Sequence, residues 1–240
     1  MLIDWKSRRR RIIAKLPALV FDVNETLLDL DALRPHFARI FGNGDVMREW
    51  FAQLILYSQA RTLAGEYATF DELGGADLQM VGETRRQHIS AEDTLAVKQA
   101  ISSMPSHPEV PDALRQLRDA GFRLFTLTNN PAATATEQLQ RAGLADLFER
   151  QFSVDAVHRY KPAPETYRFV EHQLGLSSPS CCMIACHTWD TLGALAAGWD
   201  AALIVRPGNA PLGLGPQPRV VGQDLTVVAA SLIASYGHSM

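Results

Sequence analysis

The sequence offers few features of a secreted or membrane-anchored protein. Cysteine is scarce, with 3 residues in the chain, and Cys181, Cys182 and Cys186 fall in or beside one apolar stretch without the paired spacing of a zinc site. Buried thiols are therefore expected. Long apolar runs near the amino terminus are also lacking, because Pro17 and Asp22 interrupt the one candidate. The pattern predicts neither a signal peptide nor a membrane helix, and hence a cytoplasmic protein with no membrane partner.

An excess of charge of one sign is missing as well. The formal net charge is -3, which gives no general attraction to nucleic acid, so no nucleic-acid partner is expected. The exception is a basic run at 6–11, within a segment 1–15 that we interpret as a basic N-terminal extension. A run this short is usually a solvated chain end, and a polyanion-binding arm is the alternative.

The chain does contain enough apolar sequence for a large core. Its 240 residues, 47% of them hydrophobic, suffice for one large domain or for a core domain that carries a smaller one. Apolar runs of strand length occur at 18–23, 122–127, 181–186 and 201–205. Helical patterns that end in glycine occur at 108–121, 132–143 and 191–198. This alternation predicts the α/β class, with a Rossmann-like parallel sheet and helices on both faces.

The segment 31–104 has a different pattern. It contains no run that reads as a strand, and helical periodicity continues through 45–65 and 69–87. Three prolines between 103 and 111 are typical of a linker that returns the chain to the sheet. We therefore expect a helical cap, or lid, domain at 31–104, inserted into an α/β core domain formed by 16–30 and 105–240.

Polar residues follow several of the predicted strands. Asp22 ends the first strand, Thr128 and Asn129 end the second, and the segment 187–190 follows the strand at 181–186. Lys161 precedes a proline, which favours an extended loop. Each alone has an ordinary interpretation as a turn, helix cap, buried imidazole or surface lysine. In an open parallel sheet, however, ligands bind at the carboxyl ends of the strands, and the coincidence favours one site.

At this point the motifs resemble a known family. The sequences DVNETL, TLTNN, KPAPETY and HTWD, in this order and with a helical insertion after the first, resemble the four motifs of the haloacid dehalogenase superfamily. The sequences FSVDAV, YKPAPETY and WDTLGALAAGW are similar, more narrowly, to type II 2-haloacid dehalogenases. The resemblance covers nearly all of the chain after about residue 16.

The resemblance implies a mechanism with an aspartyl ester on Asp22. Asp22 would displace halide from the substrate carbon, and water would then hydrolyse the ester. Lys161 would keep the Asp22 carboxylate ionised and oriented. Hydrogen bonds around that carboxylate are expected from Thr26, Thr128 and Asn129.

Activation of the water is assigned to the fourth motif. Asp190, acting directly or through His187, is expected to position or deprotonate the water.

The amide at Asn24 separates two reaction classes within the superfamily. In its phosphatases an aspartate at this position protonates the departing alkoxide, which an amide cannot do. Halide leaves without a proton, so the sequence favours hydrolysis of a short 2-haloalkanoic acid to the 2-hydroxy acid. Because the fourth motif has the single acid Asp190, we expect no metal and no other cofactor, with haloacid and water as the partners. The alternatives are a phosphatase-like or other small-molecule hydrolase, and a member that binds without catalysis.

The chain departs from the type II pattern at four positions. That group usually has an aromatic residue at the position of Asn24, glycine at Glu25, serine at Ala185 and asparagine at His187. Whether the imidazole acts as a base or as a hydrogen-bond donor to halide stays open.

The lid arginine of the group has no clear counterpart. Phe51 lies nearest its position, and Arg48 and Arg61 are neighbouring candidates, of which Arg48 is within one helical turn of Phe51. The residues expected to bind substrate are Asn24, Arg48, Phe51, Tyr160 and Trp189. A homodimer formed through the lid is a further expectation carried by the resemblance.

Overall fold

The fold is built on one parallel six-stranded sheet. The computed structural model describes residues 16–237, and its strand order is β3-β2-β1-β4-β5-β6. The strands are β1 (Ala18–Phe21), β2 (Arg123–Thr128), β3 (Arg150–Ser153), β4 (Cys181–Ala185), β5 (Asp200–Ile204) and β6 (Val220–Gly222). The predicted α/β class with a parallel sheet is confirmed. The expected basic extension at 1–15 lies outside the described residues.

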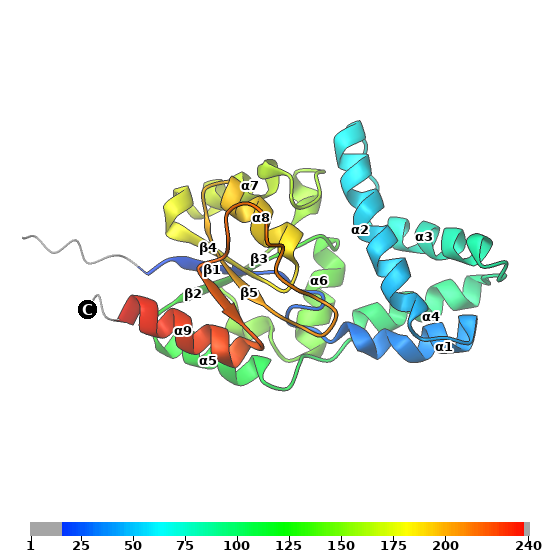
Figure 1. The fold of residues 1–240 in the computed structure, drawn as a ribbon, viewed down its shortest axis with the longest axis horizontal. Coiled ribbons are helices and arrows are strands. Elements are labelled where there is room, and N and C mark those ends of the chain that lie inside the picture. Colours follow the sequence, from blue (N-terminus) through cyan, green and yellow to red (C-terminus); the bar gives the residue numbers. More distant parts are fainter. Residues whose placement is uncertain (1–15, 238–240) are drawn as a thin grey trace, which may run out of the picture.

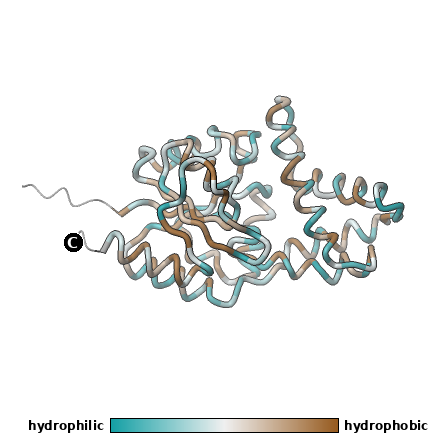
Figure 2. The backbone as a smooth tube through the Cα atoms, in the orientation of Figure 1, coloured by the Kyte–Doolittle hydropathy of each residue, from teal (hydrophilic) through white to brown (hydrophobic). Residues whose placement is uncertain are grey.

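Helices cover both faces of the sheet, which explains why its central strands are apolar throughout. One face carries α5 (Val110–Asp119) and α9 (Leu225–Gly237), and the other carries α7 (Pro164–Leu174) and α8 (Thr188–Ala196) (Figure 1). Every residue of β1 is buried, because β1 lies between β2 and β4 and is covered from both sides. The hydropathy colouring shows the apolar strands at the centre of this layer (Figure 2).

The helices between β1 and α5 lie to one side of the sheet. They are η2 (Leu30–Leu33), α1 (Arg34–Phe41), α2 (Val46–Ala64), α3 (Phe70–Thr84) and α4 (Ala91–Ser102), and we call them together the helical segment. Figure 1 shows this segment beside the sheet, with α6 (Ala132–Arg141) between them. We interpret it as the cap and the remainder of the described chain as the core.

Local sequence signals fix the starts of two of these helices. Thr69 and Glu72 form a reciprocal capping box at the start of α3, and Ser90 and Asp93 form another at the start of α4.

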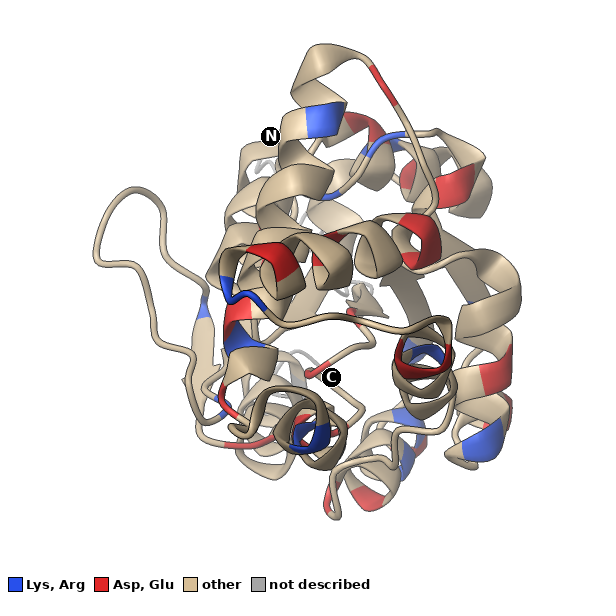
Figure 3. Cartoon of the chain, turned by 90° about the vertical axis from the view of Figure 1, so that its right-hand side faces the viewer, with Lys and Arg blue, Asp and Glu red and all other residues tan. Residues whose placement is uncertain are grey.

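The helical segment carries charged residues of both signs. Seen from its side of the molecule, basic and acidic residues are interspersed over the helices (Figure 3). In the described part of the chain, no helix combines the length and the apolar character needed to cross a membrane.

Two strands and two helices of the core were not predicted. The strands β3 and β6 are short and form the two edges of the sheet. The strand β3 also begins with the polar residues Arg150 and Gln151. An edge strand buries less of its surface, so it lacks the apolar run that marks the central strands. The helix α7 begins at Pro164, inside the motif KPAPETY, which was interpreted for its catalytic residues and not as the start of a helix. The helix α9 has no polar stripe to reveal a helical period.

Candidate active site

Asp22 stands where β1 ends, at the edge of the sheet that faces the helical segment. Its backbone N–H donates to the carbonyl of Ile184 at 3.0 Å, which closes the β1–β4 pairing. The side chain is buried, and its carboxylate accepts three hydrogen bonds. Thr26 Oγ1 donates to Oδ2 at 2.7 Å and Lys161 Nζ donates to Oδ1 at 2.9 Å. His187 Nδ1 lies 3.2 Å from Oδ2.

Lys161 is completely buried, so the interpretation as a surface lysine is wrong for this residue. Its ammonium group donates to Asp22, to Asp190 Oδ2 at 2.6 Å and to the carbonyl of Leu127 at 2.8 Å. All three protons are therefore used. Its backbone N–H donates to Asn129 Oδ1 at 3.1 Å, so the loop after β2 holds the lysine in place.

The charges of this group depend on one another. Burial acts to raise the pKa of Asp22, but the charge of Lys161 and the contacts with His187 outweigh it and hold the pKa well below its ordinary value. Burial acts to lower the pKa of Lys161, and the two carboxylates raise it overall. Asp190 is different, because burial raises its pKa despite the neighbouring ammonium. Asp22 is thus held as a carboxylate, with Lys161 as its cation.

His187 lies between two carboxylates. Its Nδ1 faces Asp22, and its Nε2 lies 2.9 Å from Glu25 Oε2. Only an imidazolium donates from both nitrogens. Burial acts to lower the pKa of His187, but contacts with Cys186, Asp22 and Glu25 raise it well above the ordinary value. With both nitrogens donating, the ring has no lone pair with which to act as a base.

Glu25 is a part of the site that was not among the predicted site residues. It is buried, its backbone has φ +63°, and its side chain also accepts from Asn209 Nδ2 at 3.0 Å and pairs with Arg48. A left-handed backbone favours glycine, which accounts for the glycine usual at this position in the resembled group. The departure from glycine was the available sequence signal.

Tyr167 is a second residue that was missed. It lies on α7, its hydroxyl donates to Asp190 Oδ1 at 2.7 Å, and it is fully buried. Its position in the motif KPAPETY was the available signal.

Arg48 lies on α2 but does not line the pocket around Asp22. Its guanidinium pairs with Glu25, and with Asp31 Oδ1 at 3.0 Å. The second candidate, Arg61, pairs with Glu66 at 3.3 Å. The structure therefore gives Arg48 a contact with the site through Glu25, and Phe51 takes the place on the pocket wall.

A small pocket opens beside the Asp22 carboxylate. It is lined by Asp22, Asn24, Phe51, Ile55, Phe70, Thr128, Asn129, His187 and Trp189. The pocket brings together residues that follow or end β1, β2 and β4 with residues of the helical segment. Five of the predicted site residues are not among those that line it: Thr26, Arg48, Tyr160, Lys161 and Asp190. Tyr160 is buried with its hydroxyl on the carbonyl of Ala68, and Asp190 lies behind Lys161.

Thr128 and Asn129 line the pocket without bonding to Asp22. Thr128 Oγ1 accepts from the backbone N–H of Asn130 at 3.1 Å, and Asn129 Oδ1 accepts from Lys161. Within residues 16–237, the side-chain donors to the Asp22 carboxylate are Thr26, Lys161 and His187. Thr26, Thr128 and Asn129 were predicted to donate to Asp22. In the structure Thr26 does so, whereas Thr128 and Asn129 bond elsewhere.

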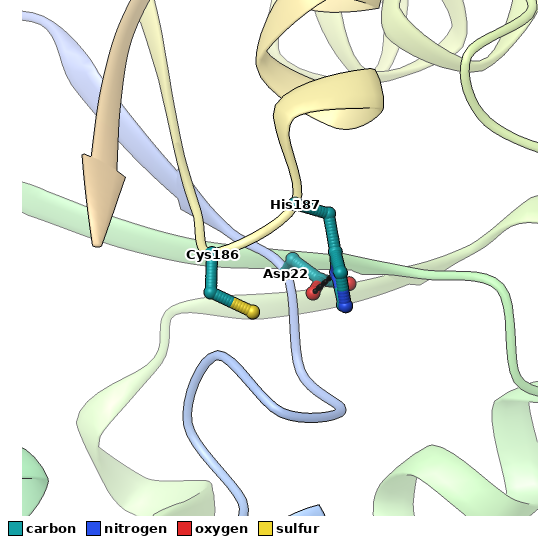
Figure 4. A group of neighbouring side chains, drawn as sticks. All are labelled: Asp22, Cys186 and His187. Atoms are coloured by element: carbon teal, nitrogen blue, oxygen red, sulfur yellow. Dashed lines mark hydrogen bonds and ion pairs between the residues drawn. The ribbon is translucent and has the colours of Figure 1, made fainter. Parts of the chain in front are cut away.

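The donor atoms of Asp22, Cys186 and His187 lie within 4.8 Å of one another (Figure 4), close enough to raise the question of a metal. None of the three side chains is free to act as a metal ligand. Both His187 nitrogens face carboxylates, and burial raises the pKa of the Cys186 thiol, which disfavours the thiolate that binds metals. Lys161 supplies a further positive charge at Asp22. The set fits a cation poorly.

The fold and the site together define an α/β enzyme with a buried, ionised aspartate at the end of β1. Residues 16–198 match the family model of haloacid dehalogenase-like hydrolases. The chain belongs to this family and is a hydrolase, which confirms the resemblance seen in the motifs.

Individual relatives agree with this family. Haloacetate dehalogenase H-2 of Moraxella sp. (strain B) is 30% identical over 85% of this chain and 92% of the relative. The (S)-2-haloacid dehalogenase of Pseudomonas sp. (strain YL) is 27% identical over 85% of this chain and 88% of the relative. The L-2-haloacid dehalogenase structure from Xanthobacter autotrophicus with chloropropionic acid covalently bound has a TM-score of 0.82 at 23% identity, covering 90% of this chain and 98% of that chain. At this identity the structural likeness shows the fold.

Proposed function

We propose that this protein is a metal-independent 2-haloacid dehalogenase that hydrolyses 2-haloalkanoic acids to 2-hydroxy acids through an ester on Asp22. The observation that carries the proposal is the combination of a buried Asp22, held ionised by Lys161, with an amide two residues further along. The relatives named as haloacetate and (S)-2-haloacid dehalogenases support the substrate class and the (S) configuration.

In the first step, an Asp22 oxygen attacks C2 of the substrate from the side opposite the halogen. The new C–O bond forms as the carbon–halogen bond breaks, and halide departs with the electron pair. This attack needs a carboxylate rather than a carboxylic acid, and the low pKa of Asp22 provides one. The Xanthobacter enzyme with chloropropionic acid covalently bound supports a covalent route.

The surroundings of Asn24 favour a leaving group that needs no proton. Asn24 Oδ1 accepts from Asn130 Nδ2 at 3.1 Å and from Gln138 Nε2 at 3.2 Å, which fixes the amide. An amide in this position gives no proton to an alkoxide, and the missing general acid is worth about 10²- to 10⁴-fold in rate. Halide is stable as a bare anion, so the same amide does not slow the displacement step.

In the second step, water attacks the carbonyl carbon of the Asp22 ester. The bond from that carbon to the substrate oxygen then breaks, the 2-hydroxy acid leaves with the proton that the water gave up, and the Asp22 carboxylate is regenerated. During the attack of water, negative charge develops on the Asp22 oxygen that did not attack C2. Lys161 donates to Oδ1, and Thr26 and His187 contact Oδ2. Whichever oxygen carries the negative charge therefore has a positively charged hydrogen-bond donor to stabilise it.

Asp190 is the acid to which we assign the water proton. Lys161 Nζ donates to both Asp22 and Asp190, so the proton reaches Asp190 by way of this ammonium group. The raised pKa of Asp190 makes it a better proton acceptor than an ordinary carboxylate. His187 is unsuited to the task because both of its nitrogens donate.

The proposal is tested by halide release from chloroacetate and (S)-2-chloropropionate in the presence of a chelator. Asp22→Asn serves as the inactive control. A single turnover in oxygen-18 water, with enzyme in excess, is expected to put label into Asp22. Label found only in the product of that turnover would contradict the ester. Magnesium-dependent cleavage of an aryl phosphate without halide release would assign the chain to the phosphatases instead.

A further inference from the structure

An apolar cavity lies between the helical segment and the edge of the sheet, beside the pocket that contains Asp22. It holds about 560 Å³ of empty space up to the open solvent, against about 220 Å³ for the Asp22 pocket. Asn24, Phe51 and Phe70 line both spaces. The two are therefore neighbours that share one wall.

The walls of the cavity suit an apolar ligand. Its apolar lining is Leu30, Trp50, Phe51, Leu54, Phe70, Leu78, Val97, Ile101 and Met104. The charged lining residues are Asp71 and Lys98, which pair with each other at 3.3 Å, and the Lys98 side chain is 60% exposed. These charges neutralise each other where the cavity meets solvent. The other polar lining residues, Asn24, Thr94 and Asn130, are uncharged, so the cavity offers no ion-pair partner to a charged group.

Two consecutive glycines in α3 leave the cavity open. Gly74 and Gly75 lie inside the helix, where glycine is among the least favourable residues. A Cβ at Gly74 would lie 3.5 Å from Trp50 and 3.7 Å from Leu54, which is ordinary contact. A methyl group therefore fits there, while a longer side chain at Gly74 would extend into the cavity.

We propose that this cavity binds the alkyl or aryl substituent on C2 of the substrate, so that the protein prefers 2-haloalkanoic acids with several carbons beyond C2 over haloacetate. This rests on the proposed function, which places C2 at Asp22. The carboxylate and the halogen then occupy the Asp22 pocket, and the remaining substituent passes Asn24, Phe51 and Phe70 into the apolar space. Each methylene buried there raises kcat/KM by roughly fourfold until the cavity is full.

The test compares halide release from bromoacetate, 2-bromopropionate, 2-bromohexanoate and 2-bromooctanoate. For the natural sequence, we expect kcat/KM to rise at least about tenfold from 2-bromopropionate to 2-bromohexanoate. Gly74→Leu is expected to remove this rise while the rate with bromoacetate stays within about twofold. Gly74→Ala, which the space accommodates, is expected to give an intermediate loss and a normal melting temperature.

The matched control is Ala96→Leu, which adds similar bulk on α4 but faces a separate surface hollow with Gln99 and Ser103. It is expected to leave the dependence on chain length unchanged. Hydrolysis of bromoacetate and 2-bromopropionate with no gain for longer acids would overturn the inference and leave the proposed function standing. Halide release from none of the four acids would overturn both.

Discussion

His187 and Glu25 form a buried ion pair directly behind the Asp22 carboxylate. The Nε2 atom of the imidazole lies 2.9 Å from Glu25 Oε2, while its Nδ1 atom lies 3.2 Å from Asp22 Oδ2. A glutamate with a left-handed backbone thus holds a cation against the nucleophile. This arrangement gives the site two positive charges, from Lys161 and His187, and a pH dependence of its own.

Glu25→Gln is expected to shift the alkaline limit of activity to lower pH. The raised pKa of His187 keeps the ring charged through neutral pH. Without the Glu25 charge, burial lowers that pKa, and the imidazolium is lost as pH rises through the lower value. We expect the alkaline limb of kcat to move down by about one pH unit or more, measured by halide release from pH 5 to 10. Glu66→Gln, at an exposed acid of the helical segment, should leave the profile unchanged.

A direct readout separates this role of Glu25 from loss of structure. NMR titration of the His187 ring should show the same fall in pKa as the kinetic limb. An unchanged His187 pKa in Glu25→Gln would contradict the account.

Arg48→Met is expected to act through Glu25 rather than through the substrate. Arg48 reaches Glu25 from α2 and does not line the Asp22 pocket. The single substitution should lower kcat by about tenfold, and it should have little further effect in the Glu25→Gln background, because residues that act as a unit are not additive. Arg85→Met, which breaks an ion pair with Glu49 within the helical segment, is the control. Additive losses in the double variant would show that Arg48 acts independently.

The sequence carried enough information to place the centre of the site, for a physical reason. Parallel strands bring their carboxyl ends to one edge, so Asp22 after β1 and His187 after β4 were bound to meet once the strands were recognised. The position of Lys161 was harder to predict, because it lies in a loop. The motif KPAPETY indicated that it belongs to the site, which its distance from the strands in the sequence did not. The fold class followed from the alternation of apolar runs with helical patterns.

The remaining contacts depend on geometry that a sequence does not display. The reach of Glu25 to His187 depends on its positive φ, and glutamate rarely adopts that conformation. The direction of Arg48 depends on how α2 is rotated against the sheet. A helical period shows that Arg48 and Phe51 share a face of α2, but it does not show which of them contacts the pocket.

Asp77→Asn is expected to stabilise the protein above about pH 6 and to have little effect near pH 4. Asp77 lies buried in α3, and its Oδ2 has no hydrogen-bond partner among the described residues. Burial raises its pKa to about 6, so the folded state holds the proton more tightly than the unfolded state. Stability is therefore lost as pH rises from about 4 through about 6.

We expect the melting temperature of Asp77→Asn to exceed that of the natural sequence at pH 8, by the equivalent of about 1 kcal/mol. The two curves should converge at pH 4.5. Asp119→Asn, at the exposed last residue of α5, is a control measured in parallel. An advantage of Asp77→Asn that is equal at both pH values would exclude ionisation as its cause.

Asp190→Asn is expected to separate the two chemical steps. If Asp190 accepts the water proton, its loss slows ester hydrolysis by about 10²-fold or more and affects halide displacement less. Halide should then appear in a burst equal to the enzyme concentration, followed by slow turnover, and mass spectrometry of the quenched protein should find the acyl group on Asp22. Tyr167→Phe removes the hydroxyl that contacts Asp190 Oδ1 and the Asp190 carbonyl, but it leaves the Asp190 carboxyl group in place, so a milder loss of about tenfold without a burst is expected. Equal slowing of both steps in Asp190→Asn would show that Asp190 acts by holding Lys161 in place, because the 2.6 Å contact between them supports the ammonium in displacement and hydrolysis alike.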